Sequence, residues 1–331
     1  MIIVRSPLRV SLLGGGTDLP AFYTKNQGSV ISFALSKYIY IAINKLAESN
    51  DILLKYSKLE RAQDIDDIRH PIVRNALKRF KVSGVDISIT SDIPAGTGLG
   101  SSSSFTVGLV KALSEYKGEI LSPSSLAELA CDIEIFDLKE PIGKQDQYAA
   151  SFGGINHFKF HQSGQVTNPE LPDKNVLESY INDCCLLLRI GSLRRSSTIL
   201  AEQSKKLQSG LNFDLMKNLA DITEKFCKEL PKSVTNLGSL LTESWELKGK
   251  LAPGITSDEI ESTLRSALKF GATGGKLLGA GGSGFILLTF ANTYLRGKYI
   301  EQIPNRDTTI IPRIDYDGCK VIFRSESNES N

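Results

Sequence analysis

Residues 94–104 read PAGTGLGSSSS and have almost no side-chain bulk with which to fill a core. Glycine at alternate positions lets the backbone approach a ligand closely, and the serines that follow stand at the expected start of a helix. A helix start offers unpaired N–H donors and the positive end of a dipole, both of which attract phosphate. The stretch therefore predicts a phosphate-binding loop. Its candidate residues are Pro94, Gly96, Gly98, Leu99, Gly100, Ser101, Ser102, Ser103 and Ser104.

This loop differs from the two common nucleotide-binding loops. A Walker loop needs a lysine after its last glycine, whereas Ser101 follows Gly100 here. Gly279, Gly281 and Gly284 match a dinucleotide-binding pattern, but they lead into a strand, whereas that pattern opens a helix. A serine-capped helix is the alternative, although three glycines and four serines exceed what capping requires. We therefore expect a third kind of phosphate site.

Two carboxylates are candidates for metal binding and catalysis. Glu134 shares a helical stripe with the small residues Ala127 and Ala130, which leaves room for a cation; a glutamate that reaches solvent is the alternative. Asp146 lies in the polar cluster PIGKQDQY, between apolar and glycine-rich neighbours that predict burial. Asp146 is therefore the candidate catalytic carboxylate, with a hydrogen-bonded loop anchor as the alternative.

Three further segments combine glycine or serine with charge or an open backbone. Asp18 follows the sequence GGGT, where it either contacts a ligand or caps the next turn. Residues 279–284 either join two strands as a hairpin turn or let the backbone approach a ligand. Arg194 and Arg195 stand beside serines and suit an oxyanion, with a solvated helix start as the alternative.

The elements expected around these residues mix helices and strands. Residues 85–89 alternate apolar and polar side chains like a half-buried strand, and helical spacing begins at Phe105, after the loop. Further strands are expected at residues 2–4, 9–13, 30–33, 38–43, 52–56, 184–190, 276–278 and 285–290, with a final hairpin around Asp317 and Gly318. Further helices are expected to begin at Pro71 and Pro123 and to span residues 199–207, 215–230, 234–251 and 259–270.

Length and composition predict a globular protein of two domains. The chain has 331 residues, of which 41% are hydrophobic and 23% charged, and its composition shifts near Pro172, so we expect domains at 1–172 and 173–331. A net charge of +2 without a basic run argues against nucleic acid as a partner. No apolar stretch reaches membrane-spanning length, and Arg5 and Arg9 interrupt the apolar start, so we expect neither a membrane partner nor a signal sequence. Five scattered cysteines predict reduced thiols in the cytoplasm rather than disulfides or a His/Cys metal centre.

Three separated stretches together resemble the GHMP kinase superfamily, which includes galactokinase, homoserine kinase, mevalonate kinase and phosphomevalonate kinase. Residues 7–18 (PLRVSLLGGGTD) resemble its first motif, residues 94–104 its phosphate loop and residues 276–285 its third motif. The resemblance implies an α+β fold of two domains, the first similar to ribosomal protein S5 domain 2 and the second ferredoxin-like, with the site between them. It also implies ATP and Mg²⁺ as cofactors.

The resemblance also implies roles for single residues. Asp146 matches the catalytic aspartate and Arg9 the basic residue beside it. Glu134 matches the magnesium-binding glutamate, and Ser102 is our assignment for the second magnesium contact, in a run of serines whose register stays open.

On the acceptor side, Asp18 matches the contact to a sugar hydroxyl, and Arg194 is the candidate for a phosphate on the sugar. The other candidate substrate contacts are Gly15, Gly16, Thr17, Gly281 and Gly282.

The pairing of LLGGGTD with PIGKQDQYAASFGG resembles the sugar-1-kinase branch, whose members phosphorylate the anomeric hydroxyl of D-glycero-D-manno-heptose 7-phosphate or close analogues. The resemblance implies a product for nucleotide-heptose and surface polysaccharide synthesis, with ATP and a sugar phosphate as partners of a monomer or homodimer. The alternatives are a kinase for unphosphorylated heptose, fucose or galactose, a mevalonate-branch kinase, and a non-catalytic sugar or nucleotide sensor. Galactokinases carry Gly-Glu-His where this chain has Gly14-Gly15-Gly16.

Overall fold

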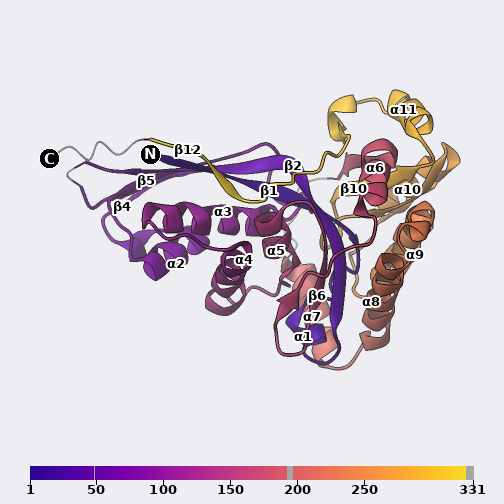
Figure 1. The fold of residues 1–331 in the computed structure, drawn as a ribbon, viewed down its shortest axis with the longest axis horizontal. Coiled ribbons are helices and arrows are strands. Elements are labelled where there is room, and N and C mark those ends of the chain that lie inside the picture. Colours follow the sequence, from indigo (N-terminus) through magenta and orange to yellow (C-terminus); the bar gives the residue numbers. More distant parts are fainter. Residues whose placement is uncertain (48, 192–196, 326–331) are drawn as a thin grey trace.

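Two β-sheets, each covered by helices, build the molecule (Figure 1). The structure is a computed structural model and describes residues 1–47, 49–191 and 197–325. The strands of the first sheet run in the order β12-β1-β2-β5-β3-β4, while β6 also pairs with β2, and β7 with β6. These strands are β1 (Ile2–Leu13), β2 (Gly28–Lys45), β3 (Ile52–Lys55), β4 (Leu59–Ala62), β5 (Val85–Ser91), β6 (Ile155–Phe160), β7 (Val166–Thr167) and β12 (Lys320–Arg324).

The two longest strands of this sheet each replace two strands that the sequence predicts. β1 continues through Pro7, where a register shift against β2 lets the ladder pass a residue without an N–H group. β2 stays extended because its two halves have different neighbours: residues 28–33 pair with β6 and residues 39–45 with β5. The short strand β4, which is not among the expected strands, pairs with β3 at the sheet edge.

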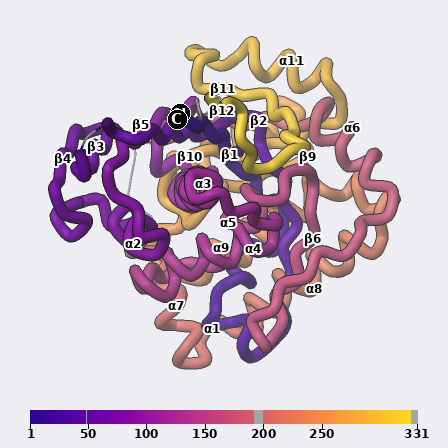
Figure 2. Tube along the Cα trace, turned by 60° about the vertical axis from the view of Figure 1, so that its left-hand side comes forward, coloured from indigo at the N-terminus to yellow at the C-terminus, as the bar shows by residue number. Residues whose placement is uncertain are grey.

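Helix α3 lies against β1 and β2 and is flanked by α2, α4 and α5, as the view along its axis shows (Figure 2). The helices of this half are α1 (Pro20–Tyr23), α2 (Pro71–Phe80), α3 (Ser101–Tyr116), α4 (Pro123–Cys131) and α5 (Gln145–Phe152), with the short turns η1 (Ile65–Asp67) and η2 (Asp132–Asp137). The glycine-rich loop therefore enters a helix, as its sequence predicts.

The second sheet is antiparallel and has the order β11-β8-β10-β9. Numbered along the chain, its strands lie in the order 4-1-3-2, which is the arrangement of a ferredoxin-like fold and confirms that prediction. Its strands are β8 (Cys185–Ile190), β9 (Ala272–Leu277), β10 (Gly284–Phe290) and β11 (Thr309–Ile310). Its helices are α6 (Lys174–Cys184), α7 (Ser197–Gln208), α8 (Phe213–Lys228), α9 (Leu237–Gly249), α10 (Asp258–Lys269) and α11 (Thr293–Gln302), with the turns η3 (Lys232–Asn236) and η4 (Arg306–Thr308).

The predicted hairpin around Asp317 and Gly318 is wrong. The strands on either side of it do not pair with each other: β11 pairs with β8, whereas β12 returns to the first sheet and pairs with β1 (Figure 1). A tight turn after Asp315, whose side chain accepts a hydrogen bond from the Gly318 N–H at 2.8 Å, redirects the chain between the two sheets. The division into domains at 1–172 and 173–331 stays a prediction. β12 comes from the second of these ranges but is a strand of the first sheet.

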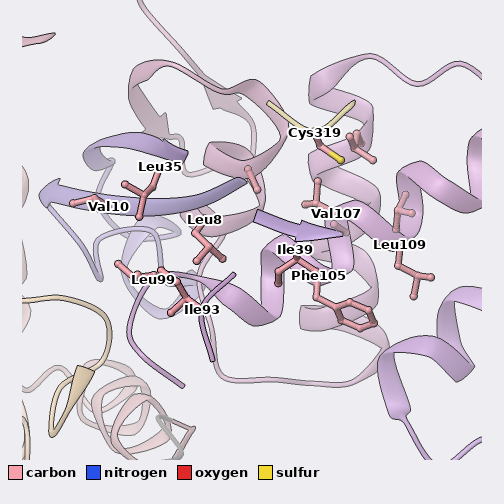
Figure 3. Close-up of a cluster of buried hydrophobic side chains, with 14 of the residues drawn as sticks. Leu8, Val10, Leu35, Ile39, Ile93, Leu99, Phe105, Val107, Leu109 and Cys319 are labelled. Carbon is pink, nitrogen blue, oxygen red and sulfur yellow. The ribbon is translucent and has the colours of Figure 1, made fainter. Parts of the chain in front are cut away.

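A continuous apolar core fills the space between the first sheet and α3. Leu99 lies in this core together with Leu8 and Ile93, and Phe105 and Val107 of α3 extend it (Figure 3). The core thus holds both ends of the glycine-rich loop. In the part of the chain that the structure describes, no helix combines the length and the apolar character needed to cross a membrane.

Candidate active site

A cavity of about 850 Å³ brings together the separated motifs. Its wall combines residues from the first motif, the glycine-rich loop and η2 with residues from the second half of the chain. The predicted site residues on this wall are Arg9, Gly15, Gly16, Asp18, Gly96, Gly98, Gly100, Ser101, Ser102, Ser103, Glu134, Asp146 and Gly281.

The N-terminus of α3 opens into this cavity. Gly100 precedes the helix with φ +74°, and no side chain caps the first turn. The first main-chain bond of this helix runs from the Ser104 N–H to the Gly100 carbonyl, so the N–H groups of the three preceding serines lack helical acceptors. Three amide donors at the positive end of a helix of 16 residues thus belong to residues that line the cavity, and this arrangement suits a phosphate.

The glycine-rich loop touches the third motif backbone to backbone. A Cβ atom added to Gly98 would lie 2.5 Å from the Leu278 carbonyl oxygen, and one added to Gly279 would lie 2.6 Å from the Gly98 Cα. The Phe285 N–H donates to the Thr97 carbonyl at 3.1 Å. Glycines at these crossings therefore let one loop from each half of the chain form a single wall.

Arg9 and Asp146 form a two-fold ion pair on that wall. Arg9 Nε and Nη2 donate to the two carboxylate oxygens at 2.7 and 2.9 Å, and Arg9 Nη1 donates to the Gly98 carbonyl at 2.6 Å. Asp146 lies in the first turn of α5, where the helix dipole favours a negative charge. The structure thus brings together the two residues predicted as catalytic and ties both to the glycine-rich loop.

Asp18 joins the first motif to the start of α5. Its carboxylate accepts hydrogen bonds from the Gly16 N–H, the Gln145 N–H and Gln145 Nε2 at 2.9 to 3.1 Å. Burial raises the pKa of Asp18, and the nearby Asp146 charge raises it further. Gly143 is needed beside it, since an added Cβ would lie 1.9 Å from Asp18 Oδ2. Asp18 therefore both orders the loop and borders the cavity.

Glu134 contacts the glycine-rich loop from η2, where the helix widens to a π-helical turn after Cys131. The side chain is 1% exposed; its oxygens accept from the Ser102 hydroxyl at 3.1 Å and from Gln147 Nε2 at 2.6 Å. This places together the two residues predicted to bind magnesium. The alternative of a solvent-reaching glutamate is wrong.

Burial raises the pKa of Glu134 to about 7, although hydrogen bonds from Ser103, Gln147 and Ser102 lower it. In the folded protein the carboxyl therefore keeps a proton to higher pH than in the unfolded chain, so its contribution to stability is lost as the pH rises through about 7.

We expect Glu134→Gln to remove this dependence of the free energy of unfolding on pH. From about pH 5 to about pH 7.5 the free energy of unfolding should fall by roughly 2 kcal/mol more in the wild type than in the variant. Urea unfolding of ligand-free protein at both pH values measures these free energies. If wild type and variant differed by the same free energy at both pH values, the prediction would be contradicted.

The donor set at Glu134 suits Mg²⁺ bound together with a nucleotide. Carboxylate and hydroxyl oxygens are hard ligands, and Mg²⁺ commonly takes one or two protein ligands and completes its shell with phosphate oxygens and water. Across residues 1–47, 49–191 and 197–325, no group of three or more His, Cys, Asp or Glu could hold a metal ion by itself. A magnesium ion at Glu134 and Ser102 would thus depend on the nucleotide phosphates.

Some predicted contacts do not lie on the cavity wall. Leu99 is fully buried in the core, and the Ser104 hydroxyl donates to the Pro7 carbonyl at 2.8 Å. The Thr17 hydroxyl donates to the Gly14 and Ser29 carbonyls, so it holds the first-motif turn. Pro94 and Gly282 are also absent from the wall. The side chains of Leu99, Ser104 and Thr17 thus serve the interior and the first-motif turn, which leaves only their main chain for a ligand. For Pro94 and Gly282 the ligand contact stays a prediction, and Arg194 lies outside the described residues.

Two wall residues escaped the sequence analysis, although each carries a signal. Lys248 follows Leu241, Ser244 and Trp245 at helical spacing, which places a lysine on the buried stripe of α9. Lys276 interrupts a buried stretch of β9 just before the third glycine turn. A charged residue in an apolar pattern is uncommon without a partner or a ligand, and that observation would have selected both.

Known proteins are similar to this chain over almost its whole length. Residues 69–154 match the family described as the GHMP kinases N terminal domain, and residues 215–292 match the GHMP kinases C terminal domain. A D-glycero-alpha-D-manno-heptose 7-phosphate kinase from Campylobacter jejuni is 30% identical over 298 residues, which cover 86% of this chain and 88% of that protein. A galactokinase from Thermotoga neapolitana is 25% identical over 91% of this chain and 93% of its own.

The fold is likewise similar to that of a solved structure. A crystal structure of a D-glycero-D-manno-heptose 1-phosphate kinase from Bacteroides thetaiotaomicron superposes with a TM-score of 0.77 at 22% identity. The match covers 98% of this chain and 100% of that one. At this identity the similarity concerns the fold alone, and it extends over both halves of the chain.

Proposed function

Because this chain belongs to the GHMP kinase family and is an ATP-dependent sugar kinase, we propose that it phosphorylates the anomeric hydroxyl of D-glycero-D-manno-heptose 7-phosphate. The observation that carries the proposal is the Arg9–Asp146 pair, which borders the same cavity as the open N-terminus of α3. A phosphoryl donor held at the helix start and an acceptor held at the carboxylate would meet there. The product would be the heptose 1,7-bisphosphate, for nucleotide-heptose and surface polysaccharide synthesis in the cytoplasm.

In this proposal the protein contributes mainly positioning and charge, which are what phosphoryl transfer requires. The N–H groups of Ser101, Ser102 and Ser103 hold phosphate oxygens of ATP. Asp146 accepts a hydrogen bond from the acceptor hydroxyl and orients it, because Arg9 fixes both carboxylate oxygens in place. Glu134 and Ser102 would hold Mg²⁺, which neutralises charge on the phosphates when bound.

The first motif supports a heptose acceptor over galactose. Gly16 has φ +103°, a conformation that residues with a side chain rarely adopt, and an added Cβ would lie 3.2 Å from Met216 Cε. An added Cβ on Gly15 would lie 3.1 Å from Ser11 Oγ. The Gly-Glu-His of galactokinases would therefore need a different loop. Galactose and fucose remain the competing acceptors, because kinases for both are similar to this chain.

A substrate panel tests the proposal. Purified protein with ATP and Mg²⁺ is offered heptose 7-phosphate, unphosphorylated heptose, fucose, galactose, mannose and phosphomevalonate, and NMR of the product identifies the modified carbon. We expect the highest kcat/KM for heptose 7-phosphate, a new phosphate on C1, and loss of turnover when EDTA removes the metal. A higher kcat/KM for any other acceptor would overturn the substrate assignment, and absence of turnover with all of them would favour a sensor.

A further inference from the structure

Two lysines on the cavity wall have no carboxylate partner among the residues that the structure describes. Lys276 of β9 is 6% exposed, and neither its ammonium nor that of Lys248 of α9 forms an ion pair within the described ranges. Lys248 Nζ donates to the Gly279 carbonyl, a neutral acceptor that leaves its charge uncompensated. The Lys276 ammonium donates no hydrogen bond to a described residue, although the main chain of Lys276 pairs with Leu287 in the sheet. A buried cation without a counter-charge is costly unless a ligand supplies one.

The contacts of the glycines place Lys248 close to the acceptor machinery. Gly279, whose carbonyl accepts from Lys248, lies directly on Gly98, and the Gly98 carbonyl accepts from Arg9 Nη1. The positive charge of Arg9 is paired with the Asp146 carboxylate through two hydrogen bonds. Among the described residues, Lys248 at this crossing and Lys276 on the same cavity wall are therefore cations that remain available to an anion.

The electrostatics of the lysines agree with this placement. Burial lowers the pKa of Lys248 to about 8; Arg9 lowers it further, whereas Asp18 and Asp146 raise it. Burial also holds the pKa of Lys276 well below its ordinary value, with further lowering by Lys248 and Arg9. The charges that act on Lys248 thus belong to the acceptor side of the cavity, and Glu134, on the proposed metal side, is not among them.

We propose that Lys248 and Lys276 bind a phosphate group that the acceptor sugar already carries, and so select a phosphorylated acceptor. The inference rests on the proposed function and deepens it, because it names the residues that bind the phosphate already present on the sugar. The phosphates of ATP have their own binding elements in the N-terminal half, namely the start of α3 with Glu134 and Ser102. Two ammonium groups with hydrogen-bond donors to spare are suited to a phosphate monoester.

Acceptor selectivity tests the proposal. Lys248→Met and Lys276→Met are compared with the wild type on heptose 7-phosphate and unphosphorylated heptose. Lys248→Arg keeps the charge, and Lys250→Met changes an exposed lysine just past the end of α9. Loss of one charged hydrogen bond should lower the kcat/KM ratio of phosphorylated to unphosphorylated acceptor roughly 10- to 100-fold in each methionine variant. Lys248→Arg should recover part of the ratio, and Lys250→Met should leave it unchanged.

An equal loss with both acceptors, together with a higher KM for ATP, would overturn the proposal and assign the lysines to the nucleotide. A second measurement does not depend on turnover. With the nucleotide site saturated by a non-hydrolysable ATP analogue and Mg²⁺, inorganic phosphate should raise the Tm of the wild type and of Lys250→Met, but not of Lys276→Met. If no sugar is phosphorylated, the proposed function fails, yet this phosphate effect would still support the anion site; its absence from the wild type would overturn the site itself.

The same variants report on folding. Removal of an unpartnered buried cation does not break an ion pair, so Lys276→Met should unfold at or above the Tm of the wild type. A marked fall in Tm would indicate a structural role for the lysine and would count against the proposal.

Discussion

Asp146→Asn is expected to lower kcat by about three orders of magnitude while nucleotide binding is retained. The asparagine keeps the shape of the side chain but presents an NH₂ group where the carboxylate now accepts from Arg9 at 2.7 and 2.9 Å. One of the two hydrogen bonds would be lost, and the group that orients the acceptor hydroxyl would lose its charge. Steady-state kinetics with heptose 7-phosphate and calorimetry with an ATP analogue measure the two effects separately.

A matched control for this variant is Asp317→Asn. Asp317 is an exposed aspartate that forms ion pairs with Arg5 and Lys320 and does not lie on the cavity wall. We expect kcat of this control to stay within about twofold of the wild type, because surface ion pairs contribute little. Turnover of Asp146→Asn near that of the control would remove the catalytic assignment. Loss of nucleotide binding together with turnover would instead point to a general loss of the site's structure.

Gly98→Ala is expected to damage both stability and nucleotide binding. Gly98 has φ +80°, and the new Cβ would lie 2.5 Å from the Leu278 carbonyl oxygen, a backbone atom with little freedom to move. Backbone strain and the clash together should lower the free energy of unfolding by roughly 2–4 kcal/mol. Because the loop must shift to relieve the clash, the Kd for an ATP analogue should rise at least about tenfold, as each 1.4 kcal/mol corresponds to a factor of ten.

Gly118→Ala separates the two causes. Gly118 has φ +76°, but nothing lies within 4 Å of an added Cβ, so this variant has the strain without the clash. We expect it to lose about 1 kcal/mol of stability and no nucleotide affinity. Urea unfolding and calorimetry on both variants make the comparison. Equal loss of stability in the two, with ATP affinity intact in Gly98→Ala, would show that contact between the two loops does not shape the phosphate site.

The site's separate parts were predictable because each depends on a local pattern. Glycines at alternate positions before a helix predicted the phosphate loop, and Asp146 and Glu134 stood out as acids among small or apolar neighbours. The structure confirms the helix after the loop and excludes a solvent-reaching Glu134, whereas the predicted burial of Asp146 is only partial, since its side chain is 23% exposed. It places Leu99 and Ser104 in the interior, because a loop that touches a ligand with one side must pack its other side against the core.

The course of the strands was less predictable, because pairing depends on distant partners. Nothing within residues 28–45 indicates that β2 exchanges β6 for β5 halfway along, and that exchange is why one strand stands where two were expected. Likewise, residues around Asp317 carry the signal of a hairpin turn, but the strand after the turn meets β1 instead. Turn chemistry determines that a chain reverses, not which strand it then joins.

The sequence by itself indicated a glycine-rich loop before a helix, the two acids and a mixture of helices and strands, because glycine conformation, helix capping and apolar periodicity act over a few residues. The family resemblance places Arg9 beside Asp146, but only the tertiary structure decided that two hydrogen bonds join them, that Gly98 lies on Gly279, and that Lys248 and Lys276 share a wall with them. The Arg9–Asp146 and Gly98–Gly279 contacts each join residues more than a hundred positions apart. Their proximity follows from how two sheets and their helices pack around one cavity, which no short stretch of sequence encodes.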